Sequence, residues 1–494
     1  MRVELKNERF YITLPQRLYV ELLEWNKEHE RMDLDLTALI LHFILKQQSE
    51  PQEWVPLSSV ILRKYDNGRY KSSEQIELLQ EGEFIEFLNH QNNIPGKENS
   101  CRRFRISSKY FEQEKDASNP TIHSYEIKQQ PLLKKLEKHN RHRKIEASST
   151  TAHLTKWLES DGFTIDKEAA FSYIEEKYHS DSRKYLTRYD KVVQFDPAQS
   201  YSRDGDDDRL HSIFTQLPKD LKPFVSYQGQ QLIEMDVKNS QPMMFVILLE
   251  EFLQHIDDLS KSKNGVKEGR LRKRIYNTLK KYINNNDTDY YNNNKYTIDI
   301  ETISYSITII LLETFGSPDI AEIDNFISLV NSGAIYEKTG ELLLSTGAIW
   351  QEEDTFFTIL YNKEKNKQEI SDFGSLRKCG KTLIINALYS PRGKGSVRAI
   401  NKVKELYPSI FRIVEAFKDP NYKDFALILQ RMEAKCILDH CAKNIARKYP
   451  DMPLICRHDS LSTSKAFGDD LFEEFKNQIE SYFGTEIKVE KEVW

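Results

Sequence analysis

Cysteine is scarce in this 494-residue chain, and the five that it has are not arranged in pairs. They form no CxxC motif, and an odd number leaves one thiol unpaired in any disulfide scheme. Cys436, His440 and Cys441 lie close together, but their spacing matches no usual zinc site. We therefore expect buried thiols in a reducing compartment, with neither a disulfide framework nor structural zinc.

Long hydrophobic runs are also missing. The longest, residues 303–315, is interrupted by Ser and Thr and is too short to span a bilayer. The first residues lack the basic and then apolar pattern of a signal peptide. These features predict a cytoplasmic protein without membrane contact.

The chain has no strong excess of one charge. Lys and Arg number 71 and Asp and Glu 76, which gives a net charge of -5 and argues against a histone-like protein. Three local basic stretches, 134–144, 267–281 and 392–404, could contact nucleic-acid phosphates or could be ordinary solvated helix faces. With 25 Phe, 25 Tyr and 5 Trp, the chain has ample material for folded cores.

The length predicts two or three domains. Residues 56–62 and 73–79 look like short helices opened by small polar residues, and 102–106 alternates like a strand. Helices followed by a basic hairpin are typical of a winged helix, which binds duplex DNA or other proteins. We expect this division: 1–50, an N-terminal helical segment; 51–115, a winged-helix-like module; 116–200, a helical connector or thumb-like region; 201–494, the main body.

Residues 377–389 carry the most informative pattern. Arg377, Lys381, Ile385 and Tyr389 stand at steps of four, so they share one face if the segment is helical. That face offers two cations for a triphosphate and an aromatic ring for a base or sugar.

Two acidic residues lie far from this helix in the sequence. Residues 231–235 predict a core strand that ends at Asp236, and 454–458 predict a second short strand that leads into Asp459. An isolated Asp usually only caps a strand or turn. Together with the cationic helix, however, two acids in one sheet could hold two Mg²⁺ ions about 4 Å apart for nucleotidyl transfer. Arg209, upstream, could reach a primer-strand sugar or phosphate.

Three other motifs mimic known sites. Residues 374–382 resemble a phosphate-binding loop but place five residues between the glycines where four are needed. Residues 299–302 resemble an exonuclease signature, but no matching set of later acids follows. Residues 204–208 resemble a calcium loop without its closing glutamate, and predict a solvated turn. We expect no ATPase, proofreading or calcium site.

Taken in order, these segments resemble the palm and fingers of family A DNA polymerases and of the single-subunit RNA polymerases of phages and mitochondria, over about residues 200–494. The resemblance implies a mixed α/β (α+β) right-hand fold. It matches Asp236 to the first metal-binding Asp, and His458-Asp459-Ser460 to the second metal motif.

The resemblance also implies roles for other residues. Arg377 and Lys381 would bind the triphosphate, with Lys381 protonating pyrophosphate, and Tyr389 would lie at the insertion site near the templating base. The primer–template contacts would be Arg209, His458 and, more loosely, Gln430.

The chain departs from the family pattern in several places. About a hundred residues are inserted around 250–370. Ile385 stands where DNA polymerases usually have an aromatic residue, and Ser460 matches the RNA polymerases. Gln241 stands where a Glu often crowds out the ribose 2′-hydroxyl, and it keeps the bulk. These signals oppose one another and favour dNTPs by a small margin.

The sequence therefore predicts a template-directed nucleotidyltransferase without proofreading, with a role in DNA replication. Its partners would be nucleoside triphosphates and either primer–template DNA or a DNA/RNA hybrid, and its cofactor two Mg²⁺ ions. One alternative is an RNA-synthesising primase or small RNA polymerase. Another is a winged-helix replication or regulatory protein whose polymerase-like half is inactive.

Overall fold

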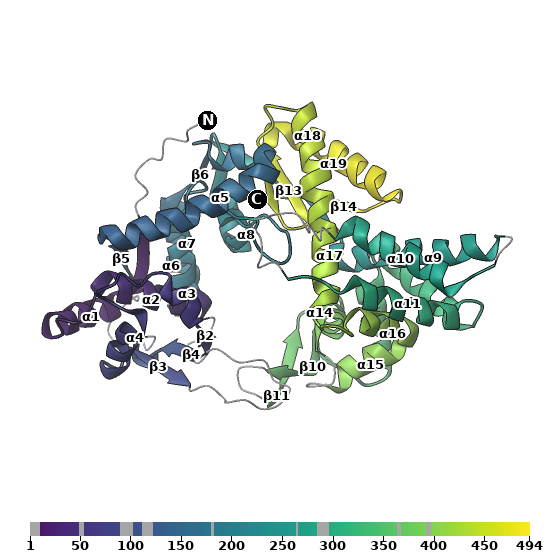
Figure 1. Ribbon diagram of the computed structural model, residues 1–494, viewed down its shortest axis with the longest axis horizontal. Helices are drawn as coiled ribbons and strands as arrows, with labels where there is room; N and C mark the ends of the chain where they lie inside the picture. The colour runs from purple at the N-terminus through teal and green to yellow at the C-terminus, as the bar shows by residue number, and fades with distance from the viewer. Residues whose placement is uncertain are drawn as a thin grey trace.

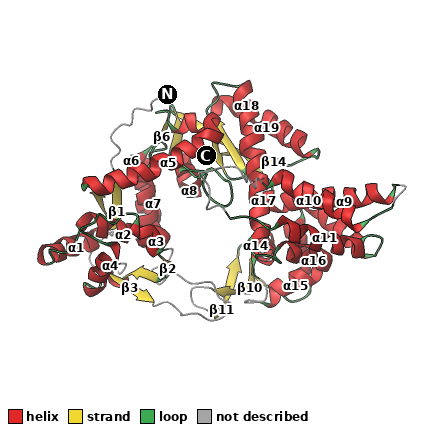
Figure 2. Cartoon of the chain, in the orientation of Figure 1, coloured by secondary structure: helices red, strands yellow, loops and turns green. Residues whose placement is uncertain are grey.

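The computed structural model describes residues 10–48, 54–88, 102–110, 122–178, 182–262, 265–283, 296–362, 367–391 and 397–494. Helices predominate, and the described strands form four separate sheets, so the chain has an α+β fold (Figures 1 and 2). None of the described helices is both long and apolar enough to cross a bilayer.

The N-terminal residues form a module around a core of its own. Helix α2 is the centre of this core because most of its apolar side chains are buried, and Asp33 caps it by accepting a hydrogen bond from the Leu36 N–H at 3.0 Å. The elements are β1 (Tyr11–Pro15), α1 (Gln16–Glu28), α2 (Leu34–Gln47), β2 (Val55–Pro56), α3 (Ser59–Arg63), α4 (Ser72–Glu81), β3 (Ile85–Leu88), β4 (Arg103–Ile106), η1 (Ser108–Tyr110) and β5 (Ile122–Glu126).

Strand β2 precedes helices α3 and α4, strands β3 and β4 follow them, and the three strands form one sheet in the order β2-β4-β3, an element order typical of a winged helix. Helix α2 packs against both α4 and β4, so it belongs to the same unit although it precedes residue 51. Strands β1 and β5 pair with each other, which ties residues 122–126 back to the start of the chain. The module therefore extends on both sides of 51–115.

A single long helix, α5 (Gln130–Leu158), connects the N-terminal module to the rest of the chain (Figure 1). Leu132 and Leu136 are buried in the first core, whereas Leu154 and Leu158 are buried in the second. Thr151 interrupts the helical backbone with φ −125° and ψ 33°. Residues 116–200 are thus shared between the two cores.

The second core surrounds an antiparallel sheet with strand order β12-β13-β8-β7-β6, and β14 also pairs with β8. Every pairing in this sheet is antiparallel. Strand β8 is central, and most of its residues are buried on both faces of the sheet. The strands are β6 (Phe163–Ile165), β7 (Val225–Tyr227), β8 (Gln230–Val237), β12 (Ile455–Arg457), β13 (Ser460–Ser464) and β14 (Val489–Val493).

Helices pack around this sheet and extend the same core. They are α6 (Lys167–Tyr178), α7 (Ser182–Val193), α8 (Ile213–Gln216), η2 (Lys219–Phe224), α9 (Ser240–Ser260), α10 (Glu268–Tyr282), α11 (Ile300–Thr314), α12 (Asp319–Ser332), α13 (Ile335–Ser345), α14 (Leu376–Tyr389), α15 (Arg398–Leu406), α16 (Pro408–Phe417), α17 (Asp424–Ala434), the π-helix η3 (Lys435–Ala442), α18 (Lys443–Lys448), η4 (Lys465–Phe467) and α19 (Gly468–Phe483). Three further strands, β9 (Trp350–Glu352), β10 (Thr355–Asn362) and β11 (Lys367–Phe373), form an antiparallel sheet just before α14.

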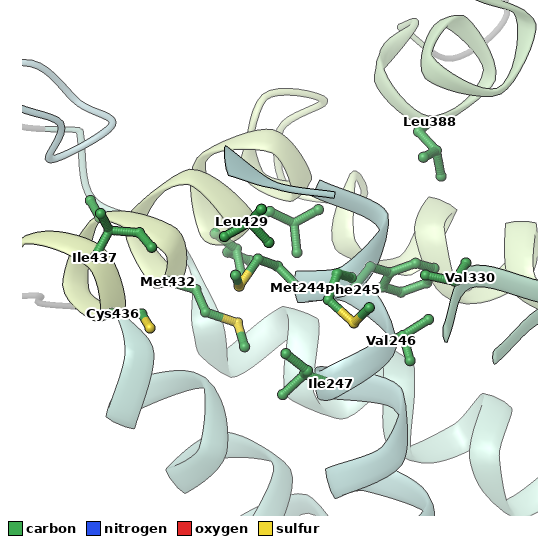
Figure 3. Close-up of a cluster of buried hydrophobic side chains, with 14 of the residues drawn as sticks. Met244, Phe245, Val246, Ile247, Val330, Leu388, Leu429, Met432, Cys436 and Ile437 are labelled. Atoms are coloured by element: carbon green, nitrogen blue, oxygen red, sulfur yellow. The ribbon is translucent and has the colours of Figure 1, made fainter. Parts of the chain in front are cut away.

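The region expected as an insertion, 250–370, is integrated into the larger core. Ile275, Leu311 and Leu343, which lie on three of its helices, are fully or almost fully buried there. Figure 3 shows how α9 meets α17 in this core, where the labelled side chains are Met244, Phe245, Val246, Ile247, Val330, Leu388, Leu429, Met432, Cys436 and Ile437.

Helices α13 and α14 cross in close contact because two glycines face each other. A Cβ atom on Gly380 would lie 2.1 Å from the carbonyl oxygen of Tyr336 and 3.2 Å from the backbone nitrogen of Gly340. Only a hydrogen fits at this position, so the crossing fixes where α14 lies.

Candidate functional site

Asp236 lies on β8, and Asp459 lies in the turn that leads into the neighbouring strand β13. Ser460 is the antiparallel partner of Asp236, and the Val237 N–H donates to the Asp459 carbonyl oxygen at 3.3 Å. Asp459 therefore lies one residue before the register position opposite Asp236. The structure brings together two acids from distant parts of the sequence.

His458 and Asp459 form the two-residue turn between β12 and β13, whose last pair is Arg457 with Ser460. His458 has a φ of 58°, in the left-handed region that non-glycine residues rarely occupy. Of the six described non-glycine residues with positive φ, Asp208, Asn239 and His458 all adjoin this site. Half of these positions therefore adjoin the site, and they are Asp, Asn and His, the residue types that most often adopt this conformation.

Both acids are held in surroundings that disfavour their charge. Burial, and then the negative charges of Glu433 and Asp236, raise the pKa of Asp459 to about 7. Burial, and then the charge of Glu234, raise the pKa of Asp236 to about 6. Within the described residues neither carboxylate has an ion-pair partner, so a bound cation would relieve this repulsion.

This electrostatic strain predicts how stability depends on pH. Both pKa values lie above the ordinary 3.8, so the folded protein binds more protons than the unfolded chain between about pH 4 and pH 7. Stability contributed by the pair is therefore lost as the pH rises through this window. Replacing both Asp236 and Asp459 by Asn should raise the unfolding midpoint temperature at pH 8 in metal-free buffer. Below about pH 4 the difference should vanish, which thermal unfolding across pH can measure.

Glu433 is a site residue that the sequence did not reveal. It lies on α17, is fully buried, and accepts hydrogen bonds from Arg209 Nη2 at 2.5 Å, Ser240 Oγ at 2.6 Å and Gln241 Nε2 at 2.8 Å. Tyr389 in turn donates its hydroxyl to Gln241 Oε1 at 3.0 Å. These bonds connect α14, α17 and the start of α9 beside the two acids.

Arg209 and His458, expected to contact a primer, both adjoin this network. Arg209 is half-buried and pairs with Glu433, and its Nε has no partner among the described residues. Burial and the charge of Arg209 lower the pKa of His458 to about 4, so this imidazole is neutral at pH 7. Its Nδ1 likewise lacks a partner within the described chain. Gln430 is half-buried on α17, one turn before Glu433.

Helix α14 presents the expected face. Its buried side is formed by Cys379, Gly380, Leu383, Ile384, Ala387 and Leu388. Lys381 is exposed, whereas Arg377, Ile385 and Tyr389 are half-buried. Arg377, Lys381 and Ile385 therefore lie outside the buried side of the helix, whereas the ring of Tyr389 packs against the core residue Phe425.

Two contacts join this face to the segment after Asp236. Arg377 pairs with Glu337 at 2.5 Å, and its other terminal nitrogen donates to Asn239 Oδ1 at 3.4 Å. Tyr389 reaches Gln241 from the far end of the helix. The cationic helix and the first acid thus belong to one continuous site.

Residues 204–208 form a turn with half-buried and exposed residues, and side chains of other helices contact it. Asp204 accepts two hydrogen bonds from Arg143 of α5, at 2.8 and 3.0 Å. Arg431 of α17 donates to the Asp206 carbonyl oxygen at 2.7 Å, and Asp207 contacts His211 at 3.2 Å. Helices distant in sequence thus supply cations that hold this loop.

Behind Asp236 lies a buried charge network centred on Glu234. The carboxylate of Glu234 contacts Lys222 and accepts from Ser460 Oγ at 2.6 Å and Trp494 Nε1 at 3.0 Å. Arg457 lies 3.4 Å away. Burial opposes the charge, but the hydrogen bonds of Lys222 and Ser460 hold the pKa of Glu234 below its ordinary value. Through Ser460 the network also holds the strand that follows Asp459.

Replacing Lys222 by Met should destabilise the fold by about 2 kcal/mol, because a buried carboxylate loses its closest cation. The remaining contact of Glu234 with Arg457 limits the loss. The matched control is Lys219→Met, since Lys219 pairs with Glu492 on the exposed surface and should change stability by less than about 0.5 kcal/mol. Denaturant unfolding of both variants provides the comparison. Equal midpoints would contradict the expected role of Lys222.

Two other sequence features have structural explanations. The Cys436 and Cys441 sulfur atoms are 3.8 Å apart and buried in the π-helix η3. Asp299 caps α11 by accepting a hydrogen bond from the N–H of Thr302.

Among the described residues no three His, Cys, Asp or Glu side chains gather as a metal site. The Asn-rich stretch 284–294 and part of the basic stretch 392–404 lie outside the described residues.

Comparisons with known proteins add little to this geometry. The POL domain of Pol1 from M. smegmatis, in complex with DNA primer-template and dNTP, is similar over 67% of this chain and 56% of that chain, with 10% sequence identity and a TM-score of 0.23. The chain thus spans a little over half the length of that domain. No family model and no curated protein matches the sequence. Function is therefore inferred from the residues of the site.

Proposed function

We propose that this chain is a template-directed nucleotidyltransferase that adds nucleotides to a 3′-hydroxyl. The observation that supports this most strongly is that Asp236, on β8, and Asp459, in the turn before the neighbouring strand β13, come together, while α14 contacts Asn239 and Gln241 shortly after Asp236. In this proposal the large sheet is the palm and α14 is the fingers helix of a right-hand polymerase.

The cationic face would hold the triphosphate. Arg377 offers a planar guanidinium suited to phosphate oxygens, and its present partner Glu337 is a half-exposed acid that phosphate can replace. Lys381 is exposed one helical turn further on, and its Nζ lies 5.8 Å from the ring centre of Tyr336. Lys381 would bind the outer phosphates and donate a proton to the leaving pyrophosphate. Tyr389 and Ile385 would border the base and sugar.

The donor set fits divalent cations. Asp236 and Asp459 are acids with raised pKa values and no ion-pair partner among the described residues. Mg²⁺ at nucleotide sites commonly takes one or two protein carboxylates and completes its shell with water and phosphate oxygens, so a pair of acids suffices. Two bound Mg²⁺ ions would lower the pKa of the attacking hydroxyl and neutralise the leaving group.

The primer end would lie at Arg209 and His458. Both present nitrogen atoms without partners in the described chain, next to Asp459. Because the His458 imidazole is neutral at pH 7, it can donate or accept a hydrogen bond without repelling a metal ion. Gln430, one turn before Glu433, would contact the primer–template junction.

Primer extension tests the proposal. A labelled primer on a defined DNA template, with Mg²⁺, should be extended by the nucleotide complementary to the template, and EDTA should stop the reaction. Without nucleotides the primer should keep its length, because no exonuclease site is proposed. Failure to incorporate either dNTPs or NTPs, on DNA and on RNA templates, would refute the proposal.

The same assay separates the alternatives. Ser460, which the RNA polymerases share, favours an RNA-synthesising enzyme, and preferential use of NTPs would support it.

A winged-helix regulator would bind duplex DNA without incorporating nucleotides. Helix α4, the second helix of the α3–α4 pair and the one that would enter a DNA groove, exposes Glu74, Glu77 and Glu81, which phosphates repel. This acidic face disfavours the regulator.

A further inference from the structure

The three-stranded sheet before α14 has an apolar face that the described residues leave exposed. Phe356 and Leu360 of β10 pack against the larger core. The alternate residues of the strand lie on the opposite face, where Ile359 is 40% exposed and its register partner Ile370 is 66% exposed. We call this surface the β10 face, and its apolar residues are Trp350, Phe357, Ile359 and Ile370.

Acidic residues surround the β10 face. Asp372 is the register partner of Phe357 and therefore lies on the same face. Glu352, Glu353 and Asp354 lie at the turn between β9 and β10, and all four acids are exposed. They would repel phosphates, so nucleic acid does not suit this surface. An apolar face with an acidic rim instead fits a protein surface that combines apolar residues with cations.

The N-terminal module carries a surface with these properties. Leu88, at the end of β3, is 44% exposed, and its register partner Arg103 is also exposed. Val60 and Ile61 of α3, which follows β2 directly, are more than half exposed. Among the described residues no acid pairs with Arg103. We call this surface the module face, and its exposed residues are Val60, Ile61, Arg63, Lys64, Leu88, Arg102 and Arg103.

The two surfaces border the same gap. Figure 1 shows the chain as an incomplete ring, in which α5 joins the N-terminal module to the larger body on one side, while β2 and β4 lie across from β10 and β11 on the other. The exposure of Leu88 and Ile370 shows that the surfaces are apart in this structure. Helix α14 packs against β10 and β11, so its cationic face lies near the gap.

The junction between the module and the larger body permits a movement of one against the other. None of the α5 residues 137–146 is buried, and the helical backbone is interrupted at Thr151. The other contact is the hydroxyl of Thr13, which donates to Asp190 beside a cavity of about 100 Å³ between β1, α2 and α7. Because the two bodies have separate cores and meet around a cavity, the junction can bend with little loss of packing.

We propose that the module face docks onto the β10 face and so closes the ring around a bound nucleic acid. Arg103 would then meet Asp372, and Leu88 would cover Ile370. Opposite charges and exposed apolar residues on the two surfaces favour this contact over any other that the chain offers. A closed ring would hold the nucleic acid between successive additions. The inference goes beyond the proposed function, because docking does not require that the chain add nucleotides.

Disulfide trapping tests the docking. The variant carries Leu88→Cys and Ile370→Cys, and every protein in the experiment carries Cys101→Ser because Cys101 stands two residues before Arg103. Copper phenanthroline accepts the two electrons when the two thiols lose their protons and form the disulfide. The cross-link should form within one chain and at least about ten times faster than in a control pair, Leu88→Cys with Tyr305→Cys. Tyr305 is 46% exposed on α11, which Figure 1 shows on the outer side of the larger body.

Charge reversal in the cysteine variant tests whether complementary charges bring the surfaces together. Arg103→Glu and Asp372→Arg should each slow the cross-link about fivefold, because a like-charge pair replaces an attraction. The double reversal restores opposite charges and should return the rate to within about twofold. Both residues are exposed, so neither change disturbs a core. The matched control is Glu405→Arg, an exposed position on α15, which should leave the rate unchanged.

Retention on circular DNA tests the enclosure. Protein cross-linked while bound to a primed single-stranded circle should stay on it at high salt, where charge contacts are screened, and should leave a linear DNA of the same length. Cross-linking no faster than in the Tyr305 pair, cross-links between chains, or release from the circle would each overturn the inference. A cross-linked protein that keeps the circle while the unmodified protein adds no nucleotide would uphold the ring and refute the proposed function.

Discussion

Replacing Asp459 by Asn should lower the rate of nucleotide addition at least about a thousandfold, equivalent to about 4 kcal/mol of transition-state stabilisation. The amide keeps the size of the side chain but cannot supply the negative charge that a metal ion needs. The measurement is the single-turnover rate of primer extension at saturating Mg²⁺ and nucleotide.

Unfolding cannot explain such a loss, because relief of the repulsion from Glu433 and Asp236 should make this variant more stable at neutral pH. Asp469→Asn is the control: its side chain is 96% exposed and pairs with Lys491 away from the site. A variant of Asp459 that retained more than about a tenth of the rate would remove the main support for two-metal chemistry.

Replacing Gly380 by Ala should destabilise the larger core by about 3 kcal/mol. In a helix interior this change normally adds up to about 1 kcal/mol of stability. Here the new methyl group would lie 2.1 Å from the Tyr336 carbonyl oxygen, so α13 and α14 must separate and the steric cost exceeds the propensity gain. Thermal unfolding should show a clearly lower midpoint temperature.

Gly374→Ala is the matched control for this change. Gly374 lies just before α14, and a Cβ atom there would have no neighbour within 4 Å. Its unfolding midpoint should be unchanged or slightly higher. Gly380→Ala should also slow nucleotide addition, since α14 carries Arg377 and Lys381. A Gly380→Ala protein as stable as the Gly374→Ala protein would show that the crossing tolerates a side chain.

The sequence predicted those parts of the site that depend on local periodicity. Between Arg377 and Tyr389 the expected site residues recur every four positions. Any helix over this segment places such residues on one face, so the sequence alone was enough to predict it. The short apolar runs that lead into Asp236 and Asp459 likewise correspond to β8 and to the β12–β13 hairpin. What each residue binds stays a prediction until activity is measured.

The rest of the site depends on contacts between distant segments. In a sequence, Glu433 resembles any acid on a helix surface, and such residues are usually exposed. The available signal was its place on the apolar face of α17, four residues after Leu429 and eight after Phe425. Glu234 gave a similar signal, an acid inside an apolar strand, but its partners Lys222 and Trp494 are evident only once the sheet is assembled.

The position of β8 at the centre of the large sheet has a consequence for biosynthesis. Its main partners, β13 and β14, lie more than two hundred residues later in the chain. The strand that carries Asp236 therefore cannot form these pairings until both partners have been synthesised. Pairings of such high contact order form slowly. The N-terminal module, whose strands pair within the first 126 residues, can complete its own core first. Until the last strands emerge, the apolar face of β8 is exposed to chaperones and to aggregation.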